Sequence, residues 1–332
     1  MKPGELFEEV KRKANVVGYS LKPQPRIRNG KTLPELCFRV YVSRKLPAKE
    51  LRATDVIPRE IGGVPVDVVE VGEVRALGYT IKEGKPEKTR RFRPVIFGVS
   101  IGHVQVTAGT NGFLFADKKG NQYFGSNAHV LTPDPSKEPD RILVKDIVQP
   151  GPYDGGTLAD KVAEYVWHRR IVPVGGGSGC PVARVWAGIY NSLAKALGAR
   201  TRLVPVIAEP NRVDFAVASP KTEFLIRFPD FDFTGHKFVG LGFAGSDVAS
   251  LVCKAGHIAD EGYYPVGAGT AEVREGDVVM KTGRTSCFTK AKVIDASAAM
   301  KVGYGSFTAW FEDVVLTEKL LEPGDSGSSV WL

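Results

Sequence analysis

Apolar and polar residues alternate along most of the chain, a pattern that is typical of β-strands. After residue 95, short runs of this kind are separated by turns rich in Gly and Asn, as in a barrel or sandwich. We therefore predict a mainly β fold. The clearest alternating runs lie at residues 35–45, 63–77, 95–109, 112–117, 122–131, 212–219, 276–286, 291–298 and 307–316.

Helical spacing of apolar residues occurs in a few segments only. Residues 4–14 predict one amphipathic helix, and residues 48–56 predict a short one that ends before Pro58. A third helix is predicted as an insertion near residues 180–200. The sequence leaves open whether its broad apolar face packs on the barrel or on a neighbouring subunit.

A change in composition divides the chain into two predicted domains. Residues 84–94 are basic and contain two prolines, which is typical of a solvated linker. We predict an N-terminal α/β accessory domain over residues 1–83 and a larger β domain over residues 95–332.

The composition narrows the class of protein. Of 332 residues, 43% are hydrophobic and 25% charged, as in soluble globular proteins. There is no apolar leader and no run of roughly 18 apolar residues, so we expect a cytoplasmic protein without a membrane partner. The net charge is +8, but the basic residues are dispersed along the chain, and their one dense run lacks interleaved aromatic residues. This pattern does not favour a nucleic-acid partner. The four scattered cysteines indicate neither a zinc site nor disulfides.

Three short segments supply the residue types of a nucleophilic serine site. A serine hydroxyl needs a base to remove its proton, and the base needs a partner that fixes its tautomer. "GSNAHVL" places His129 at the end of a predicted strand, and "NRVDFAVA" places Asp214 at the start of another. In "EPGDSGSS", Gly324 and Gly327 allow a tight turn around Ser326. Such a turn directs the amides of Gly324 and Ser326 into one pocket, where they can stabilise an oxyanion.

With these motifs in the order His, Asp, Ser, the chain resembles the trypsin-like serine peptidases. "GSNAHVL" stands where that family has its Ala-Ala-His-Cys segment. Over residues 30–330 the chain resembles a bacterial branch related to the plant narrow-leaf trypsin-like protein. Six motifs carry this resemblance: "GVSIGHVQVTAGT", "NAHVL", "VQPGPYDGG", "NRVDFAVA", "KTGRTS" and "EPGDSGS".

The resemblance implies a chymotrypsin-like double β-barrel over residues 95–332. The expected activity is that of a serine endopeptidase that cleaves protein or peptide substrates through an acyl-enzyme, without a metal or organic cofactor. It implies that His129 is the general base, that Asp214 orients it, and that Ser326 is the nucleophile.

The resemblance also implies two supporting roles. Arg284 of "KTGRTS" would form an ion pair with Asp325 and hold the oxyanion turn open. Leu320, six residues before the nucleophile, would form the floor of the specificity pocket and favour apolar or small side chains. His103 alternates within a predicted strand, so we expect a packed histidine there and not a catalyst.

Only six residues follow Ser326, whereas the second barrel of this family continues beyond the nucleophile. An open barrel would leave an unpaired strand edge. We expect that the chain is truncated. The alternatives are completion of the barrel by another subunit, which would make the protein a homo-oligomer, and a catalytically inactive scaffold or interaction protein.

Overall fold

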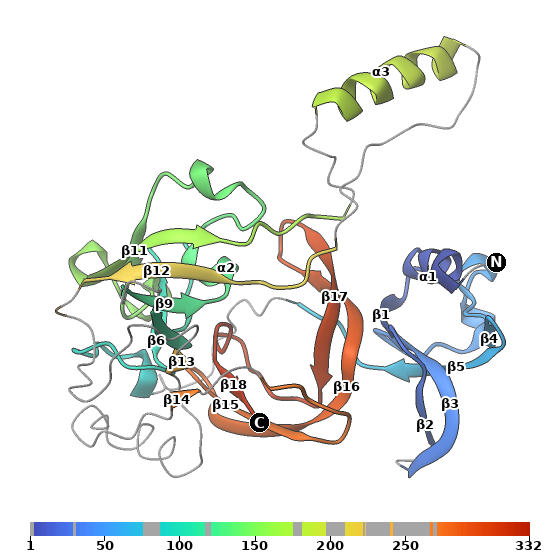
Figure 1. The fold of residues 1–332 in the computed structure, drawn as a ribbon, viewed down its shortest axis with the longest axis horizontal. Helices are drawn as coiled ribbons and strands as arrows, with labels where there is room; N and C mark the ends of the chain where they lie inside the picture. Colours follow the sequence, from blue (N-terminus) through green and yellow to red (C-terminus); the bar gives the residue numbers. More distant parts are fainter. Residues whose placement is uncertain are drawn as a thin grey trace.

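The fold is mainly β, as the alternating pattern predicts. Within the described residues, the strands form two nine-stranded sheets (Figure 1). The computed structural model describes residues 3–28, 31–75, 87–116, 121–174, 181–196, 210–221, 223, 240–241, 266–267 and 271–332.

The first sheet, here called the mixed sheet, joins strands from both ends of the chain. Its order is β18-β15-β16-β1-β3-β5-β4, with β17 paired to β16 and β2 paired to β3. Among its described strand pairs, β3–β5 alone is parallel. Its strands are β1 (Val16–Ser20), β2 (Gln24–Arg28), β3 (Lys31–Val42), β4 (Glu60–Ile61), β5 (Val64–Glu70), β15 (Val278–Gly283), β16 (Cys287–Gly303), β17 (Thr308–Thr317) and β18 (Val330–Trp331).

The second sheet, here called the antiparallel sheet, has the order β14-β13-β8-β9-β12-β11-β10-β6-β7. It surrounds the largest apolar cluster of the described residues, which includes Ile101, Leu114 and Phe124. Its strands are β6 (Ser100–His103), β7 (Gly109–Thr110), β8 (Phe113–Ala116), β9 (Gln122–Ser126), β10 (Asp146–Val148), β11 (Lys161–His168), β12 (Ala216–Pro220), β13 (Gly240–Leu241) and β14 (Val266–Gly267).

The helices agree with the predicted segments in two of three cases. Helices occur at residues 3–11 and 181–196, close to two of the predicted segments, but residues 48–56 contain two 3₁₀ turns instead of one helix. Arg52 between these turns is extended, with φ −65° and ψ 150°, and this interrupts the helix. The helices are α1 (Pro3–Lys11), α2 (Ala128–Leu131) and α3 (Pro181–Ala196), and the 3₁₀ turns are η1 (Ala48–Glu50), η2 (Ala53–Asp55), η3 (Glu87–Thr89), η4 (Pro139–Arg141), η5 (Pro152–Asp154) and η6 (Leu158–Asp160).

The N-terminal strands continue the sheet formed by the C-terminal strands. β1 pairs antiparallel with β16, and Gly18 lies opposite Met300. The Tyr41 hydroxyl of β3 donates a buried hydrogen bond of 2.5 Å to Asp295 Oδ2 of β16. The predicted division at residues 84–94 therefore separates segments that share one hydrogen-bonded sheet. The division into domains stays a prediction.

The described part of the predicted linker, residues 87–94, is only partly solvated, because Arg90 and Arg91 are exposed but their neighbours are not. Lys88 and Phe92 are buried. The amide of Phe92 donates a hydrogen bond of 2.8 Å to Gln149 Oε1. The charged sequence does not indicate this packing, because even Nζ of Lys88 is buried and has no hydrogen-bond partner among the described residues, and burial lowers the pKa of Lys88 to about 7.

Gly18 tests the contact between β1 and β16. A Cβ atom at this position would lie 2.6 Å from the carbonyl oxygen of Ala299 and would also overlap Met300 Sδ. We expect Gly18→Ala to lower the free energy of unfolding by about 1–3 kcal/mol in urea denaturation, since overpacking forces the backbone apart.

Gly188→Ala is the matched control, because its added methyl group meets nothing within 4 Å. In a helix this change is expected to be neutral or to stabilise by up to about 1 kcal/mol. Equal stability of Gly18→Ala and the native chain would contradict the β1–β16 pairing.

Candidate active site

The register of two neighbouring strands brings His129 and Asp214 together. β9 and β12 are antiparallel, with Ser126 opposite Ala216. The chain that leaves β9 therefore meets the chain that enters β12 at the same end of the antiparallel sheet. His129 lies in α2 just after β9 and not on the strand itself. Its Nδ1 atom is 2.6 Å from Asp214 Oδ2.

The carboxylate of Asp214 is fixed by hydrogen bonds from two further groups. Its Oδ1 accepts from the Ala128 amide at 2.6 Å, and its Oδ2 accepts from the Tyr304 hydroxyl at 3.0 Å. Burial by itself raises the pKa of Asp214, but the His129 charge and these hydrogen bonds outweigh it, so the pKa lies below its ordinary value. Asp214 is thus held as an anion.

An anionic Asp214 determines which nitrogen of His129 can act as a base. A carboxylate only accepts hydrogen bonds, so Nδ1 of His129 donates and Nε2 carries the free lone pair. Nε2 is buried and has no hydrogen-bond partner among the described residues. The tautomer is therefore the one that a general base requires.

Tyr304, at the end of the β16–β17 hairpin, is a site residue that the sequence analysis missed. Its ring meets the His129 ring edge-on at 5.8 Å between centroids, and it stacks on Phe307 at 5.0 Å. Burial and the neighbouring Asp214 charge both raise the pKa of Tyr304, so its hydroxyl stays protonated and can donate. Nothing in "VGYGSF" signals this role, because it depends on the pairing of β16 with β17.

The turn around Ser326 is fixed to the antiparallel sheet. Gly324 and Gly327 have φ values of +95° and +93°, a left-handed conformation that favours glycine. The amide of Thr110 donates to the Ser326 carbonyl at 2.8 Å, and the Thr110 hydroxyl donates to the Gly324 carbonyl at 3.0 Å. The amides of Gly324 and Ser326 themselves donate to no described residue, so they remain available to an oxyanion.

His129, Asp214 and Ser326 line one cavity of about 470 Å³. His129 and Asp214 lie beside one end of the antiparallel sheet, whereas Ser326 lies between β17 and β18 of the mixed sheet. A chymotrypsin-like double barrel divides its triad in this way. Among the described residues no hydrogen bond links Ser326 to His129. Such contacts are often long until substrate binds.

The carboxylate of Asp325, next to Ser326, accepts five hydrogen bonds. Its Oδ1 atom accepts from the amides of Thr285 at 2.8 Å and Ser286 at 3.0 Å. Its Oδ2 atom accepts from Lys281 Nζ at 2.8 Å, from the Glu322 amide at 2.9 Å and from the Ser286 hydroxyl. The side chains of Lys281 and Asp325 are both 0% exposed.

The charge of Asp325 is stabilised by these donors. Burial alone raises the pKa of Asp325, but the charge of Lys281 and the hydrogen bonds outweigh it, and the pKa lies below its ordinary value. Burial also lowers the pKa of Lys281, against the attraction of Asp325. We take the pair as ionised, because five donors surround the carboxylate.

The predicted ion pair between Arg284 and Asp325 is wrong, and Lys281 takes the place of Arg284. Lys281 and Gly283 lie two positions apart and so share a face of β15. Gly283 leaves room for the carboxylate on that face, since a Cβ atom there would lie 2.7 Å from Asp325 Cγ. The motif "KTGRTS" does supply the cation, but the alternation of the strand places its lysine, and not its arginine, toward Asp325.

Arg284 pairs instead with Asp154 of η5. Its Nε atom lies 2.7 Å from Asp154 Oδ2, its Nη2 atom contacts Oδ1, and both side chains are 1% exposed. Its guanidinium also lies 5.6 Å from the centre of the Tyr153 ring. The Arg284 amide donates to the Thr110 hydroxyl at 3.0 Å. "VQPGPYDGG" thus supplies a buried anion that connects the two sheets behind the turn.

The predicted pocket floor at Leu320 is also not supported. Leu320 packs in an apolar cluster with Val279, Ala291 and Val293 and does not line the cavity. Its carbonyl accepts from the Thr289 hydroxyl at 2.7 Å, which directs this part of the chain toward β16. The next residue, Leu321, lines the cavity instead.

The other histidines and cysteines have structural environments where they are described. His103 is fully buried, accepts from the Gln105 amide at 3.0 Å and donates to the Val144 carbonyl at 2.9 Å, so the prediction of a packed histidine is confirmed. Cys37 is a buried free thiol. Cys287 is disulfide-bonded, which the cysteine spacing did not indicate. The histidines 236 and 257, the cysteines 180 and 253, and the glycine run 175–179 lie outside the described residues.

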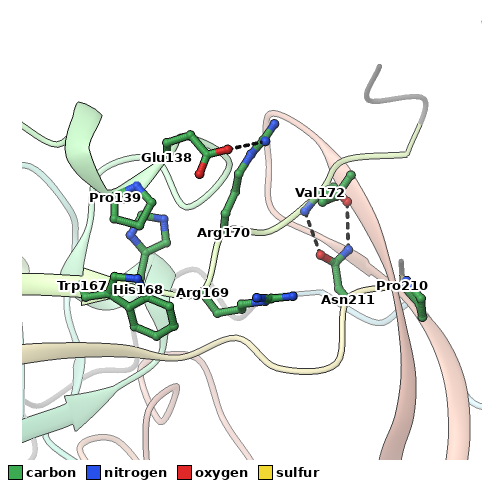
Figure 2. A pocket seen from close by; sticks show the side chains of 9 residues that line it. All are labelled: Glu138, Pro139, Trp167, His168, Arg169, Arg170, Val172, Pro210 and Asn211. Atoms are coloured by element: carbon green, nitrogen blue, oxygen red, sulfur yellow. Dashed lines mark hydrogen bonds and ion pairs between the residues drawn. The ribbon is translucent and has the colours of Figure 1, made fainter. Parts of the chain in front are cut away.

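A second cavity, of about 290 Å³, lies at the end of β11 (Figure 2). Its wall includes Trp167, Arg169 and the ion pair between Arg170 and Glu138 at 2.6 Å. No member of the His-Asp-Ser set lines it. The cavity marks the place where the insertion that carries α3 leaves the antiparallel sheet.

Comparisons with known proteins find similar solved structures but no matching sequence family. No family model and no curated protein matches the chain. One similar solved structure is a glutamic-acid-specific serine protease described as using a novel histidine triad in substrate binding. It is 14% identical, with 72% of this chain and 80% of that chain covered and a TM-score of 0.36. Another is the Nocardiopsis protease NAPase, 15% identical, with 71% and 78% covered and a TM-score of 0.34. The candidate site is defined by the residue contacts above and not by this likeness.

Lys281→Met tests the assignment of the cation that faces Asp325. The variant leaves a buried carboxylate without its cation, so we expect a loss of about 3 kcal/mol in the free energy of unfolding at pH 7. Lys290→Met, at an exposed position of β16, is the matched control and is expected to change little.

The loss of unfolding free energy in Lys281→Met should depend on pH in a defined direction. Because the folded pKa of Asp325 is depressed, its ionised form stabilises the fold above about pH 4 and this contribution is lost as pH falls. A protonated Asp325 no longer needs a cation, so the difference between native chain and variant is expected to shrink on acidification. A penalty that stays constant from pH 7 to pH 3 would contradict the pairing.

Proposed function

We propose that the protein is a trypsin-like serine endopeptidase. The observation that carries the proposal is the His129–Asp214 contact of 2.6 Å in a cavity that Ser326 also lines. This arrangement supplies a nucleophile, a base in the required tautomer and a fixed anion. The free amides of Gly324 and Ser326 add donors for a developing negative charge.

The proposed reaction proceeds through an acyl-enzyme. Ser326 Oγ attacks the carbonyl carbon of the substrate while His129 Nε2 takes its proton. The amides of Gly324 and Ser326 stabilise the resulting oxyanion. His129 then returns the proton to the leaving amine, and a water molecule, deprotonated in turn by His129, hydrolyses the ester. Asp214 remains ionised throughout and stabilises the imidazolium.

The lining of the cavity supports a preference for apolar or small substrate side chains. Met300, Val302 and Val314 contribute apolar surface beside the catalytic groups. The earlier expectation relied on Leu320, which is packed elsewhere. We keep the same preference on the basis of these three residues.

The remaining assignments are proposals of the same kind. The substrate would be a protein or peptide, and the nucleophile, base and oxyanion donors all come from the chain itself. A homo-oligomer and a division into accessory and peptidase domains stay predictions. The cytoplasmic location stays a prediction too, and the disulfide of Cys287 argues against it, since disulfides persist mainly in oxidising compartments.

Covalent labelling separates a peptidase from a catalytically inactive scaffold. We expect a fluorophosphonate probe to label the native chain once, and Ser326→Ala to abolish the label, because the probe needs an activated serine. Ser219→Ala, an exposed serine on β12, is the matched control and should label fully. A folded native chain that takes up no label, or a Ser326→Ala chain that is labelled as well, would sink the proposal.

Tyr304→Phe tests the hydroxyl that donates to Asp214. We expect kcat to fall about fivefold to tenfold on a peptide substrate with little change in KM, since the lost hydrogen bond orients the base rather than binding substrate. Tyr190→Phe, on the exposed face of α3, is the matched control and should match the native chain. A Tyr304→Phe variant with native kcat would show that the hydroxyl does not position Asp214.

A further inference from the structure

Where its side chains are described, helix α3 exposes large apolar residues and buries small ones. Val185, Trp186, Ile189 and Tyr190 are exposed, and Trp186 is 65% exposed. Ala187, in contrast, is only 4% exposed. At 3.6 residues per turn, the four exposed residues lie on one arc of the helix. A helix that packs on its own core shows the reverse arrangement, with the large side chains buried.

The structure holds this helix away from the two sheets (Figure 1). The insertion leaves the body after Val172 and returns at Asn211, and the side chain of Asn211 joins these two ends (Figure 2). Its Oδ1 accepts from the Val172 amide at 2.8 Å, and its Nδ2 donates to the carbonyls of Val172 and Trp310, both at 2.9 Å. The two ends of the insertion are thus fixed to each other and to β17, and α3 projects from them.

The charge of the insertion indicates what the exposed face meets. Residues 173–210 contain four basic residues, Arg184, Lys195, Arg200 and Arg202, against one acidic residue, Glu209, next to the return at Asn211. Within α3, positions 184 and 195 lie on the arc opposite the exposed apolar residues, together with Asn191. The helix therefore combines an apolar face containing Trp and Tyr with a basic polar face.

We propose that α3 is an interfacial helix that docks the protein onto an anionic lipid surface. Helices of this type lie in the plane of the membrane, with the apolar face among the acyl chains and the basic residues near the headgroups. Trp and Tyr favour this boundary, and each Lys or Arg adds attraction to anionic lipid. A second copy of the chain complements the face less well, because it presents the same basic insertion.

The proposal revises the expectation of no membrane partner without requiring a membrane span. No described helix is long and apolar enough to cross a bilayer. A helix of 16 residues that lies in the interface does not need to cross it. In this arrangement the peptidase cavity would be tethered near the membrane surface.

Vesicle co-sedimentation of the full chain tests the proposal. We expect binding to phosphatidylserine–phosphatidylcholine vesicles, weaker binding as salt is raised, and little binding to pure phosphatidylcholine. The double variant Trp186→Ser/Ile189→Ser should bind at least about tenfold more weakly, because it removes the inserted apolar surface. Leu143→Ser/Leu158→Ser, at residues 88% and 62% exposed elsewhere, is the matched control and should bind as the native chain does.

Charge reversal gives an independent test. Arg184→Glu/Lys195→Glu should lower binding to the anionic vesicles by about tenfold or more, whereas Lys49→Glu/Arg52→Glu, exposed in the N-terminal segment, should not. All variants are compared at equal thermal stability, because none alters a buried group of the two sheets.

Three results would overturn the proposal. The first would be a native chain that fails to bind the anionic vesicles. The second would be a Trp186→Ser/Ile189→Ser variant that binds them as well as the native chain does. The third would be a native chain that binds no vesicle and self-associates through this face in analytical ultracentrifugation. The last result would assign the face to a second copy of the chain.

Discussion

The buried carboxylate of Asp325 is the constraint on which the candidate site depends. It accepts hydrogen bonds from three backbone amides, one hydroxyl and the ammonium of Lys281. A buried anion with fewer partners would be costly, so the turn can adopt only the conformation that satisfies it. That conformation places Ser326 at the cavity and leaves the amides of Gly324 and Ser326 free. The second buried pair, Arg284 with Asp154, fixes the same region to the antiparallel sheet.

The position of the proposed base, His129, depends on a different part of the fold. The pairing of β9 with β12 sets the His129–Asp214 contact, and the β16–β17 hairpin adds the Tyr304 hydroxyl. Asp214 therefore receives donors from both sheets, as does the turn around Ser326. Neither half of the site is assembled by one sheet alone. The two backbones also approach closely beside Thr110, since a Cβ atom at Gly109 would lie 2.8 Å from the Ser326 carbonyl oxygen.

The sequence predicted the elements well and the side-chain partners less well. Alternation and helical spacing depend on neighbouring residues, so the strands, α1 and α3 were predictable. The order of His129, Asp214 and Ser326 indicated a candidate site through a family resemblance, and the structure brings the three residues to one cavity. The partner of Asp325 was predicted as Arg284 and is Lys281, because the choice depends on which face of β15 meets the turn. Tyr304 and the packing of Leu320 depend on contacts between distant strands, which a single sequence does not specify. The exposed face of α3 was visible as a broad apolar face, but only the structure shows that it stays uncovered.

A crystal structure of the protein after reaction with diisopropyl fluorophosphate tests the central claim most directly. The account predicts one phosphoryl group on Ser326 Oγ, with its oxygen within hydrogen-bond distance of the amides of Gly324 and Ser326. It also predicts Lys281 Nζ in contact with Asp325 and the Arg284 guanidinium in contact with Asp154. A phosphoryl group on another residue, or an Asp325 carboxylate paired with Arg284, would contradict it.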